Sequence, residues 1–216
     1  MALFGPSKRI LKNELAEMRM QRDAALSLAH EDPLTGLNNR RALDLEIHKH
    51  DSRLKREATE KVYRDVAFIV IDVNNLKLIN DNYGHEAGDS MIMAVAGVLN
   101  DLTRHGTDTV ARTGGDEFVV VLPVDVSHSN PIMASHFATR VANVFANRVI
   151  NNLEKIMVSG TNEPITVSLG IATYHSSEDS MQKALAMADA RMYNMKNSMK
   201  VGGNKPHDAF FEAHRN

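Results

Sequence analysis

The stretch over residues 109–122 constrains this chain more than any other. It reads Thr-Val-Ala-Arg-Thr-Gly-Gly-Asp-Glu-Phe-Val-Val-Val-Leu, which predicts two short apolar strands joined by a tight turn. Gly114 and Gly115 would supply the positive φ angles that such a turn needs. The turn then holds two adjacent carboxylates, Asp116 and Glu117, on a rigid support. Taken alone, this pattern is better explained as a solvated acidic turn than as a functional site.

A second acidic position upstream changes that interpretation. Residues 66–71 are a continuous apolar run that predicts a buried strand, and Asp72 lies at its C-terminal end. A strand that ends in Asp72, beside a hairpin that carries Asp116 and Glu117, can supply hard oxygen ligands for Mg²⁺. Sites of this kind serve phosphoryl and nucleotidyl transfer.

Residues 114–118 read Gly-Gly-Asp-Glu-Phe, the signature that names the GGDEF family of diguanylate cyclases. Three further stretches resemble motifs of that family in the expected order: Asp-Pro-Leu-Thr-Gly-Leu-Asn-Asn-Arg-Arg (32–41), Asp-Val-Asn-Asn-Leu-Lys-Leu-Ile-Asn-Asp (72–81) and Gly-His-Glu-Ala-Gly-Asp (84–89). The resemblance covers most of the chain. It implies synthesis of cyclic di-GMP from GTP, with Mg²⁺ as the cofactor and Mn²⁺ as an alternative.

The pattern of apolar segments predicts an α/β (α+β) fold, a mixed sheet with helices mainly on one face. Besides the hairpin and the Asp72 strand, it predicts a strand over residues 165–174, and helices over 7–29, from 39 onward, and over 90–103, 131–153 and 180–200. The resemblance refines this to a palm-like, ferredoxin-related fold. We expect residues 1–31 to form an N-terminal helix and residues 32–216 to form the cyclase domain.

The first predicted helix begins after Ser7, a residue that can cap it, and runs without Pro or Gly to about Ala29. Its apolar residues have heptad-like spacing, interrupted by Arg22 (Leu11, Leu15, Met18, Ala25 and Ala29). The helix can therefore pair with its copy in a homodimer or pack on its own domain. The resemblance favours the dimer, and it makes this helix a candidate docking site for a separate sensor protein.

Asp72 and Asp116 are the predicted metal ligands, because Mg²⁺ needs few protein carboxylates when water and phosphates complete its shell. The resemblance adds the backbone carbonyl of Val73. Many family members carry Asp where this chain has Asn74, and a neutral amide is a weaker donor, so Asn74 is not counted as a ligand. Glu117 has two candidate roles, support of a second metal ion or deprotonation of the attacking hydroxyl.

Asn80 and Asp89 match the family's guanine-contacting positions. A carboxylate accepts from both N1–H and the N2 amino group of guanine, whereas adenine offers an acceptor at N1. The structural alternatives are a turn residue for Asn80 and an N-cap of the helix at Ser90 for Asp89.

Lys77 and Lys196 resemble the family's phosphate-binding lysines, and Gly114 and Gly115 belong to the matched substrate site. The Gly-Arg-Asn that follows Lys196 in the family is altered here. Lys200 stands where Arg is expected, and an ammonium cannot reproduce the bidentate grip of a guanidinium.

Just before the hairpin, many family members carry an Arg-x-x-Asp site that binds the product. Its Asp would be Asp108, but the Arg position holds His105, with Arg104 one residue out of register. His lacks the planar fork of Arg, so we expect weak or absent product inhibition through this site.

The composition limits the partners. The net charge is −2 and there is no cysteine, so we expect neither nucleic-acid binding nor disulfides. No apolar run approaches the roughly 20 residues that cross a bilayer, and the N-terminus lacks a signal-peptide core, so we expect a cytoplasmic protein without membrane contact.

The predicted function is a homodimeric diguanylate cyclase in which the 3′-hydroxyl of each GTP attacks the α-phosphate of the other. One alternative is a GTP-binding module of the same fold that signals through protein contacts without turnover. Another is an enzyme that makes a different dinucleotide, which Asp89 argues against.

Overall fold

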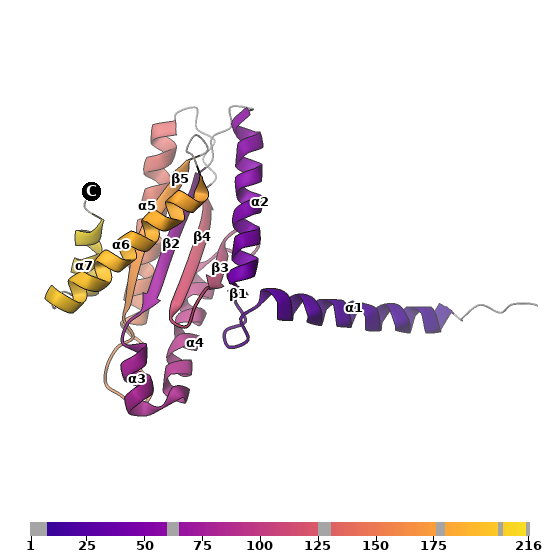
Figure 1. Ribbon diagram of the computed structural model, residues 1–216, viewed down its shortest axis with the longest axis horizontal. Coiled ribbons are helices and arrows are strands. Elements are labelled where there is room, and N and C mark those ends of the chain that lie inside the picture. The colour runs from indigo at the N-terminus through magenta and orange to yellow at the C-terminus, as the bar shows by residue number, and fades with distance from the viewer. Residues whose placement is uncertain (1–7, 60–64, 125–130, 176–179, 203–204, 215–216) are drawn as a thin grey trace, which may run out of the picture.

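The computed structural model describes residues 8–59, 65–124, 131–175, 180–202 and 205–214. In chain order the elements are α1 (Lys8–His30), β1 (Asn38–Asn39), α2 (Arg40–Thr59), β2 (Asp65–Val73), α3 (Leu76–Tyr83), α4 (His85–Leu102), β3 (Thr109–Arg112), β4 (Glu117–Val124), α5 (Pro131–Leu153), β5 (Val167–His175), α6 (Met181–Gly202) and α7 (Pro206–Ala213). The fold class is the predicted one, a mixed sheet with flanking helices (Figure 1).

The sheet has the strand order β1-β3-β4-β2-β5. β1 pairs in parallel with β3, and all other neighbours are antiparallel. β2 is buried along its whole length between β4 and β5, as its apolar sequence predicts. The C-terminal end of β2 therefore lies between β4 and β5 at one end of the sheet, where the predicted site residues meet.

Helices cover both faces of the sheet, so the expectation of helices mainly on one face is wrong. Ile69 and Ile71 of β2 belong to a core that includes α4, α5 and α7. Phe68 and Val70 belong to a second core with α2 and α6. The cause is the period of two in a strand, which places alternate apolar side chains of β2 on opposite faces. Figure 1 shows α6 in front of the sheet and α5 behind it.

The predicted hairpin is present as β3 and β4, but neither of its glycines has a positive φ. The amide of Thr113 donates to the carbonyl of Glu117 at 2.9 Å, which closes a three-residue loop. This loop is longer than a two-residue turn, and the left-handed conformation expected at Gly114 and Gly115 is not needed.

Two helical predictions also need correction. α4 begins at His85, five residues before the predicted start at Ser90, and it follows α3 directly through Gly84 with φ 86°. α7 was not predicted. It buries Ala209 and Phe210 in the core to which α4 and α5 also contribute.

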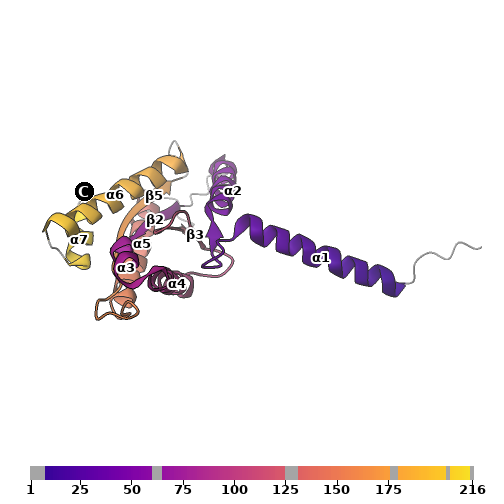
Figure 2. The same cartoon turned by 60° about the horizontal axis from the view of Figure 1, so that its bottom comes forward.

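α1 extends away from the domain in both views (Figures 1 and 2). Leu15, Met18 and Leu28 are 45%, 60% and 85% exposed, so α1 does not pack along its own domain. Its C-terminal end is tied to the start of α2, where Asn39 Nδ2 donates to the carbonyl of Ala29 at 3.0 Å. The predicted cap at Ser7 lies outside the described residues.

Candidate active site

Asp72 lies one residue before the end of the buried strand β2 and is 4% exposed. In the sheet register it stands between Glu117 of β4 and Ser168 of β5, so these three side chains project from the same face. The amide of Val73 donates to the carbonyl of Asp116 at 2.9 Å. Backbone pairing thus brings Asp72, Val73, Asp116 and Glu117 together, as the sequence predicts.

Lys196 reaches this point from α6, one helical turn after the buried Met192. Its Nζ lies 2.6 Å from Asp72 Oδ1 and 2.7 Å from Oδ2. Only the contact with Oδ2 has hydrogen-bond geometry, so the buried Oδ1 receives no hydrogen bond. Lys196 was predicted to bind phosphate, and here it neutralises the central carboxylate.

The charge of Asp72 is costly in this position. Burial raises the pKa of Asp72 above its usual value, and Asp116 acts in the same direction, whereas Lys196 and Lys200 oppose the shift. The net shift is upward. An added divalent cation would stabilise the ionised form.

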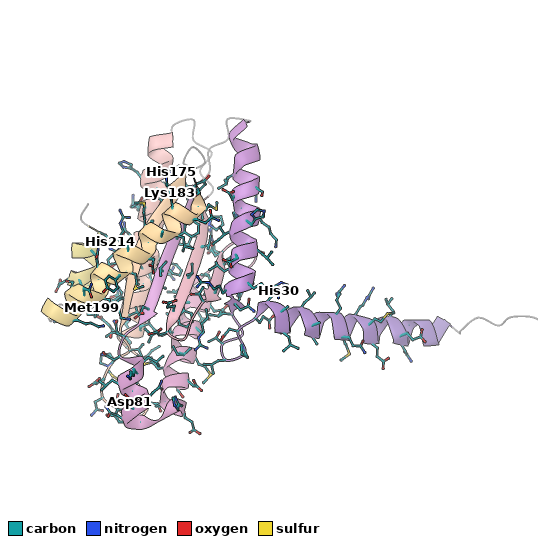
Figure 3. All side chains as sticks on the ribbon, viewed as in Figure 1. His30, Asp81, His175, Lys183, Met199 and His214 are labelled. Atoms are coloured by element: carbon teal, nitrogen blue, oxygen red, sulfur yellow. The ribbon has the colours of Figure 1, made fainter. Side chains whose placement is uncertain are left out.

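A cleft of about 530 Å³ opens beside Asp72. It is lined by the end of β2, α3, the acidic turn, the residue before β5 and the end of α6 (Val73, Asn74, Asn75, Leu76, Lys77, Leu78, Asp81, Asp116, Thr166, Lys196, Met199 and Lys200). Figure 3 labels two lining residues from different elements, Asp81 on α3 and Met199 on α6. In the described part of the chain, Lys77 and Lys200 have no carboxylate within ion-pair distance. The cleft therefore offers two uncommitted cations to an anionic ligand.

Asn74 joins β2 to β5. Its side-chain amide lies 2.9 Å from Ser168 Oγ, and its backbone amide donates to the carbonyl of Thr166 at 3.0 Å. The side-chain amide is thus used in a structural link between the two strands. Ser168 was not predicted, because only the sheet register brings it to Asn74.

The two predicted guanine contacts lie outside the lining of the cleft, on the neighbouring helices α3 and α4. Asn80 Oδ1 is buried and accepts no hydrogen bond, and a Cβ added to Gly88 would lie only 1.9 Å from it. Asp89 is exposed and sits in the second turn of α4. The N-cap alternative for Asp89 is therefore wrong, since Gly84 occupies that position.

Glu117 lines a separate pocket of about 260 Å³ between α2 and α6, together with Arg40, Thr113 and Asp189 among others. Neither Gly114 nor Gly115 lines the cleft. A Cβ on Gly114 would lie 3.0 Å from Glu117 Oε2, so the missing side chain leaves room for that carboxylate. Glu117 therefore faces this pocket, whereas its neighbour Asp116 faces the lysine-lined cleft.

Arg112 is a residue of the site that sequence reasoning missed. Its Nη1 donates to Asp32 Oδ1 at 3.1 Å, and its Nη2 donates to the carbonyl of Gly115 at 2.7 Å. Burial alone would raise the pKa of Asp32, but hydrogen bonds from Thr35 and Arg112 outweigh it and lower that pKa. Arg112 fixes the acidic turn to the loop that follows α1.

The oxygen donors at this site fit a magnesium ion that takes most of its remaining ligands from water and the substrate. Among the described residues, no three Asp, Glu, His or Cys side chains converge in a metal-binding group. Two carboxylates, Asp72 and Asp116, lie close together, and Asp72 Oδ1 accepts no hydrogen bond. Mg²⁺ suits this arrangement, because it is commonly held by one or two carboxylates plus phosphates.

The family profile for "Diguanylate cyclase, GGDEF domain" matches residues 29–201. The chain belongs to the GGDEF family. Diguanylate cyclase VdcA from Vibrio cholerae serotype O1 is 32% identical over 187 residues, which cover 87% of this chain and 48% of that protein. This GGDEF chain thus spans about half the length of that curated relative.

Two solved structures resemble this GGDEF chain. The coiled coil and GGDEF domain of DgcB from Caulobacter crescentus, in complex with c-di-GMP, matches with a TM-score of 0.71 and 26% identity, over 91% of this chain and 93% of that one. The diguanylate cyclase SiaD of Pseudomonas aeruginosa, in complex with its activator SiaC, matches with a TM-score of 0.63 and 26% identity, over 88% and 68% of the two chains. In the part of this chain that the structure describes, no helix combines the length and apolarity needed to cross a bilayer.

Proposed function

We propose that this protein is a diguanylate cyclase that condenses two GTP molecules into cyclic di-GMP and two pyrophosphates. The observation that carries the proposal is that Asp72 and Asp116 lie beside the lysine-lined cleft at the C-terminal end of β2. Carboxylates for a metal beside lysines for phosphates are the groups that nucleotidyl transfer requires. Membership of the GGDEF family, with diguanylate cyclases among the relatives, supports the same reaction.

The residues have distinct roles in this proposal. Asp72, Asp116 and the carbonyl of Val73 would hold Mg²⁺, or Mn²⁺ in its place, which when bound offsets the negative charge of the phosphates. Lys77, Lys196 and Lys200 bind the triphosphate as charge moves to the departing pyrophosphate. Asn80 and Asp89 read the guanine edge.

Each reaction forms one bond and breaks one. The 3′-oxygen of one GTP bonds to the α-phosphorus of the other, and the bond from that phosphorus to pyrophosphate breaks. The proton of the 3′-hydroxyl must leave, and Glu117 is a candidate acceptor because it projects from the same face as Asp72. Support of a second metal ion is its other candidate role.

Two GTP-loaded sites must face each other, so the reaction needs a homodimer, at least a transient one. α1 is its proposed organiser, since its exposed side chains include Leu15, Met18 and Leu28, and the similar DgcB structure includes a coiled coil. Figure 3 shows the side chains of α1 standing clear of the domain. The same helix is a candidate docking site for a separate sensor protein or an activator.

A second candidate function is a GTP-binding module without turnover. Lys200 favours it, because this lysine replaces an expected arginine and is exposed in the cleft. Chromatography of the products formed from GTP alone, and then from GTP with ATP, separates the candidates. Cyclic di-GMP under both conditions supports our proposal. Bound but unchanged GTP supports the module, and a mixed dinucleotide would contradict guanine selection by Asp89.

A further inference from the structure

The ion pair between Lys196 and Asp72 lies where a metal ion would have to bind. Asp72 is flanked in the sheet by β4 and β5, and its side chain is 6% exposed. Lys196 places Nζ 2.6 Å and 2.7 Å from the two carboxylate oxygens. Because Nζ lies within 2.7 Å of both oxygens, the ammonium would strongly repel a divalent cation on the same carboxylate. Tight metal binding at Asp72 therefore requires Lys196 to move away.

We infer that Lys196 is a placeholder for the metal, which keeps divalent cations off Asp72 until a nucleotide triphosphate arrives and gives the lysine another partner. This inference rests on the proposed function of the site, and it adds an order of binding. The metal enters with the nucleotide, and the protein without nucleotide has low metal affinity.

The fold allows the lysine to move while its helix stays in place. α6 is anchored by Ala188, Met192 and Met195, which are at most 5% exposed. The Lys196 side chain itself is 23% exposed and has a flexible four-carbon stem at the edge of the cleft. A triphosphate in the cleft would offer Nζ several oxygens in exchange for the two of Asp72. Rotation of the Lys196 side chain alone is then enough to free the carboxylate of Asp72 for the metal.

Lys200 provides a matched comparison. It lines the same cleft from the same helix, one turn further along, and carries the same charge. It forms no ion pair with Asp72 in the described structure. A general electrostatic effect of the lysines on cation binding would appear in both residues, whereas the placeholder role belongs to Lys196 alone.

The test is Mn²⁺ binding without nucleotide, measured by electron paramagnetic resonance, for the wild type, Lys196→Met, Lys196→Arg and Lys200→Met. Methionine keeps most of the stem without the charge. Lys196→Met is expected to bind Mn²⁺ at least about tenfold more tightly than the wild type, because a like charge in contact with the carboxylate is removed. Lys196→Arg and Lys200→Met should stay within about threefold of the wild type, because each keeps a cation beside Asp72. In contrast, Lys196→Met should bind a non-hydrolysable GTP analogue more weakly than the wild type.

Unchanged or weaker Mn²⁺ binding by folded Lys196→Met would overturn the inference, as would equal gains from Lys196→Met and Lys200→Met. Circular dichroism of each variant establishes that it is folded. The double variant Asp72→Asn with Lys196→Met should lose the gain, and a gain that persists would place the metal elsewhere and overturn the inference. The proposed function is tested separately. If Lys196→Met binds Mn²⁺ more tightly without nucleotide but the wild type makes no cyclic di-GMP, the placeholder role of Lys196 is supported and the cyclase activity is refuted.

Discussion

Arg112 connects Asp32 to the acidic turn, with Nη1 3.1 Å from Asp32 Oδ1 and Nη2 2.7 Å from the carbonyl oxygen of Gly115. The loop after α1 and the turn that carries Asp116 are therefore held as one unit. This link gives a physical route by which the position of α1 can affect the geometry of the turn.

Replacing Arg112 by Ala should lower cyclase activity by at least about tenfold, since the turn loses its anchor and can shift by the distances that matter for catalysis. It should also lower the free energy of unfolding by about 1–3 kcal/mol, because Asp32 loses a charged hydrogen-bond donor. Product assays and urea unfolding measure the two effects. Arg41→Ala is the control, since Arg41 is exposed on α2. Equal effects of the two substitutions would refute the anchor.

Gly88→Ala should weaken GTP binding by about tenfold, because the new methyl group would lie 1.9 Å from Asn80 Oδ1 and displace that amide. Gly97→Ala is a matched control in the same helix, where an added Cβ meets nothing within 4 Å. It should keep GTP affinity and raise stability by about 0.5–1 kcal/mol. Calorimetric titration with a GTP analogue measures both affinities. Unaltered affinity in Gly88→Ala would argue against Asn80 as a base contact.

Asp72→Asn should abolish cyclase activity without lowering the stability of the nucleotide-free protein at neutral pH. The folded state raises the pKa of Asp72 above its usual 3.8, so the folded protein holds this proton more tightly than the unfolded chain does. This contribution to stability is fully present when the pH is below the pKa of Asp72 in the unfolded chain. It is lost as the pH rises through the pKa of Asp72 in the folded protein. Asparagine resembles the protonated form.

Relative to the wild type, Asp72→Asn should therefore gain melting temperature between acidic and neutral pH, by about 2–4 °C for each kcal/mol. Differential scanning calorimetry at several pH values measures this difference. A variant that becomes progressively less stable than the wild type over that interval would contradict the upward shift of the pKa.

Cyclic di-GMP should inhibit the protein weakly or not at all through the segment before the hairpin. His105 stands at the expected arginine position, and Arg104 is already engaged by Asp108 (2.7 Å) and by the carbonyl of Pro123 (2.9 Å). Initial rates at increasing cyclic di-GMP should be the same for the wild type and Asp108→Ala. Micromolar inhibition of the wild type that Asp108→Ala removes would show that the site is intact.

Removal of the residues before Asp32 should lower specific activity in dilute protein and less so in concentrated protein, because α1 is proposed to raise the fraction of dimer. Rates over a range of protein concentrations, with the mass of each species from analytical ultracentrifugation, test this. The same activity for both forms at every concentration would exclude α1 as the organiser.

The sequence was most informative where local pattern and tertiary position agree. The apolar run before Asp72 could belong only to a buried segment, and it is β2, which lies between β4 and β5. The hairpin followed from the Val-rich flanks of its two glycines. The start of α4 was missed because Gly84 and Gly88 lie close together, and Gly88 is in fact a packing position against Asn80.

Pairings across long sequence separations could not be read from the chain. Lys196 and Asp72 are joined by an ion pair, although they lie 124 positions apart. The Arg112–Asp32 contact spans 80 positions, and it depends on how β1 pairs with β3. Motif resemblance assigned Lys196 to phosphate, but only the folded geometry places it on the proposed metal ligand.

The most direct test of the central claim is the incubation of purified protein with GTP and Mg²⁺, with Asp116→Ala as a control, followed by chromatography of the nucleotides. We expect cyclic di-GMP and pyrophosphate in a ratio of about 1:2 from the wild type, as the proposed bond changes require, and neither product from Asp116→Ala. Bound GTP without product over a wide range of wild-type concentrations, or equal product from Asp116→Ala, would contradict this claim.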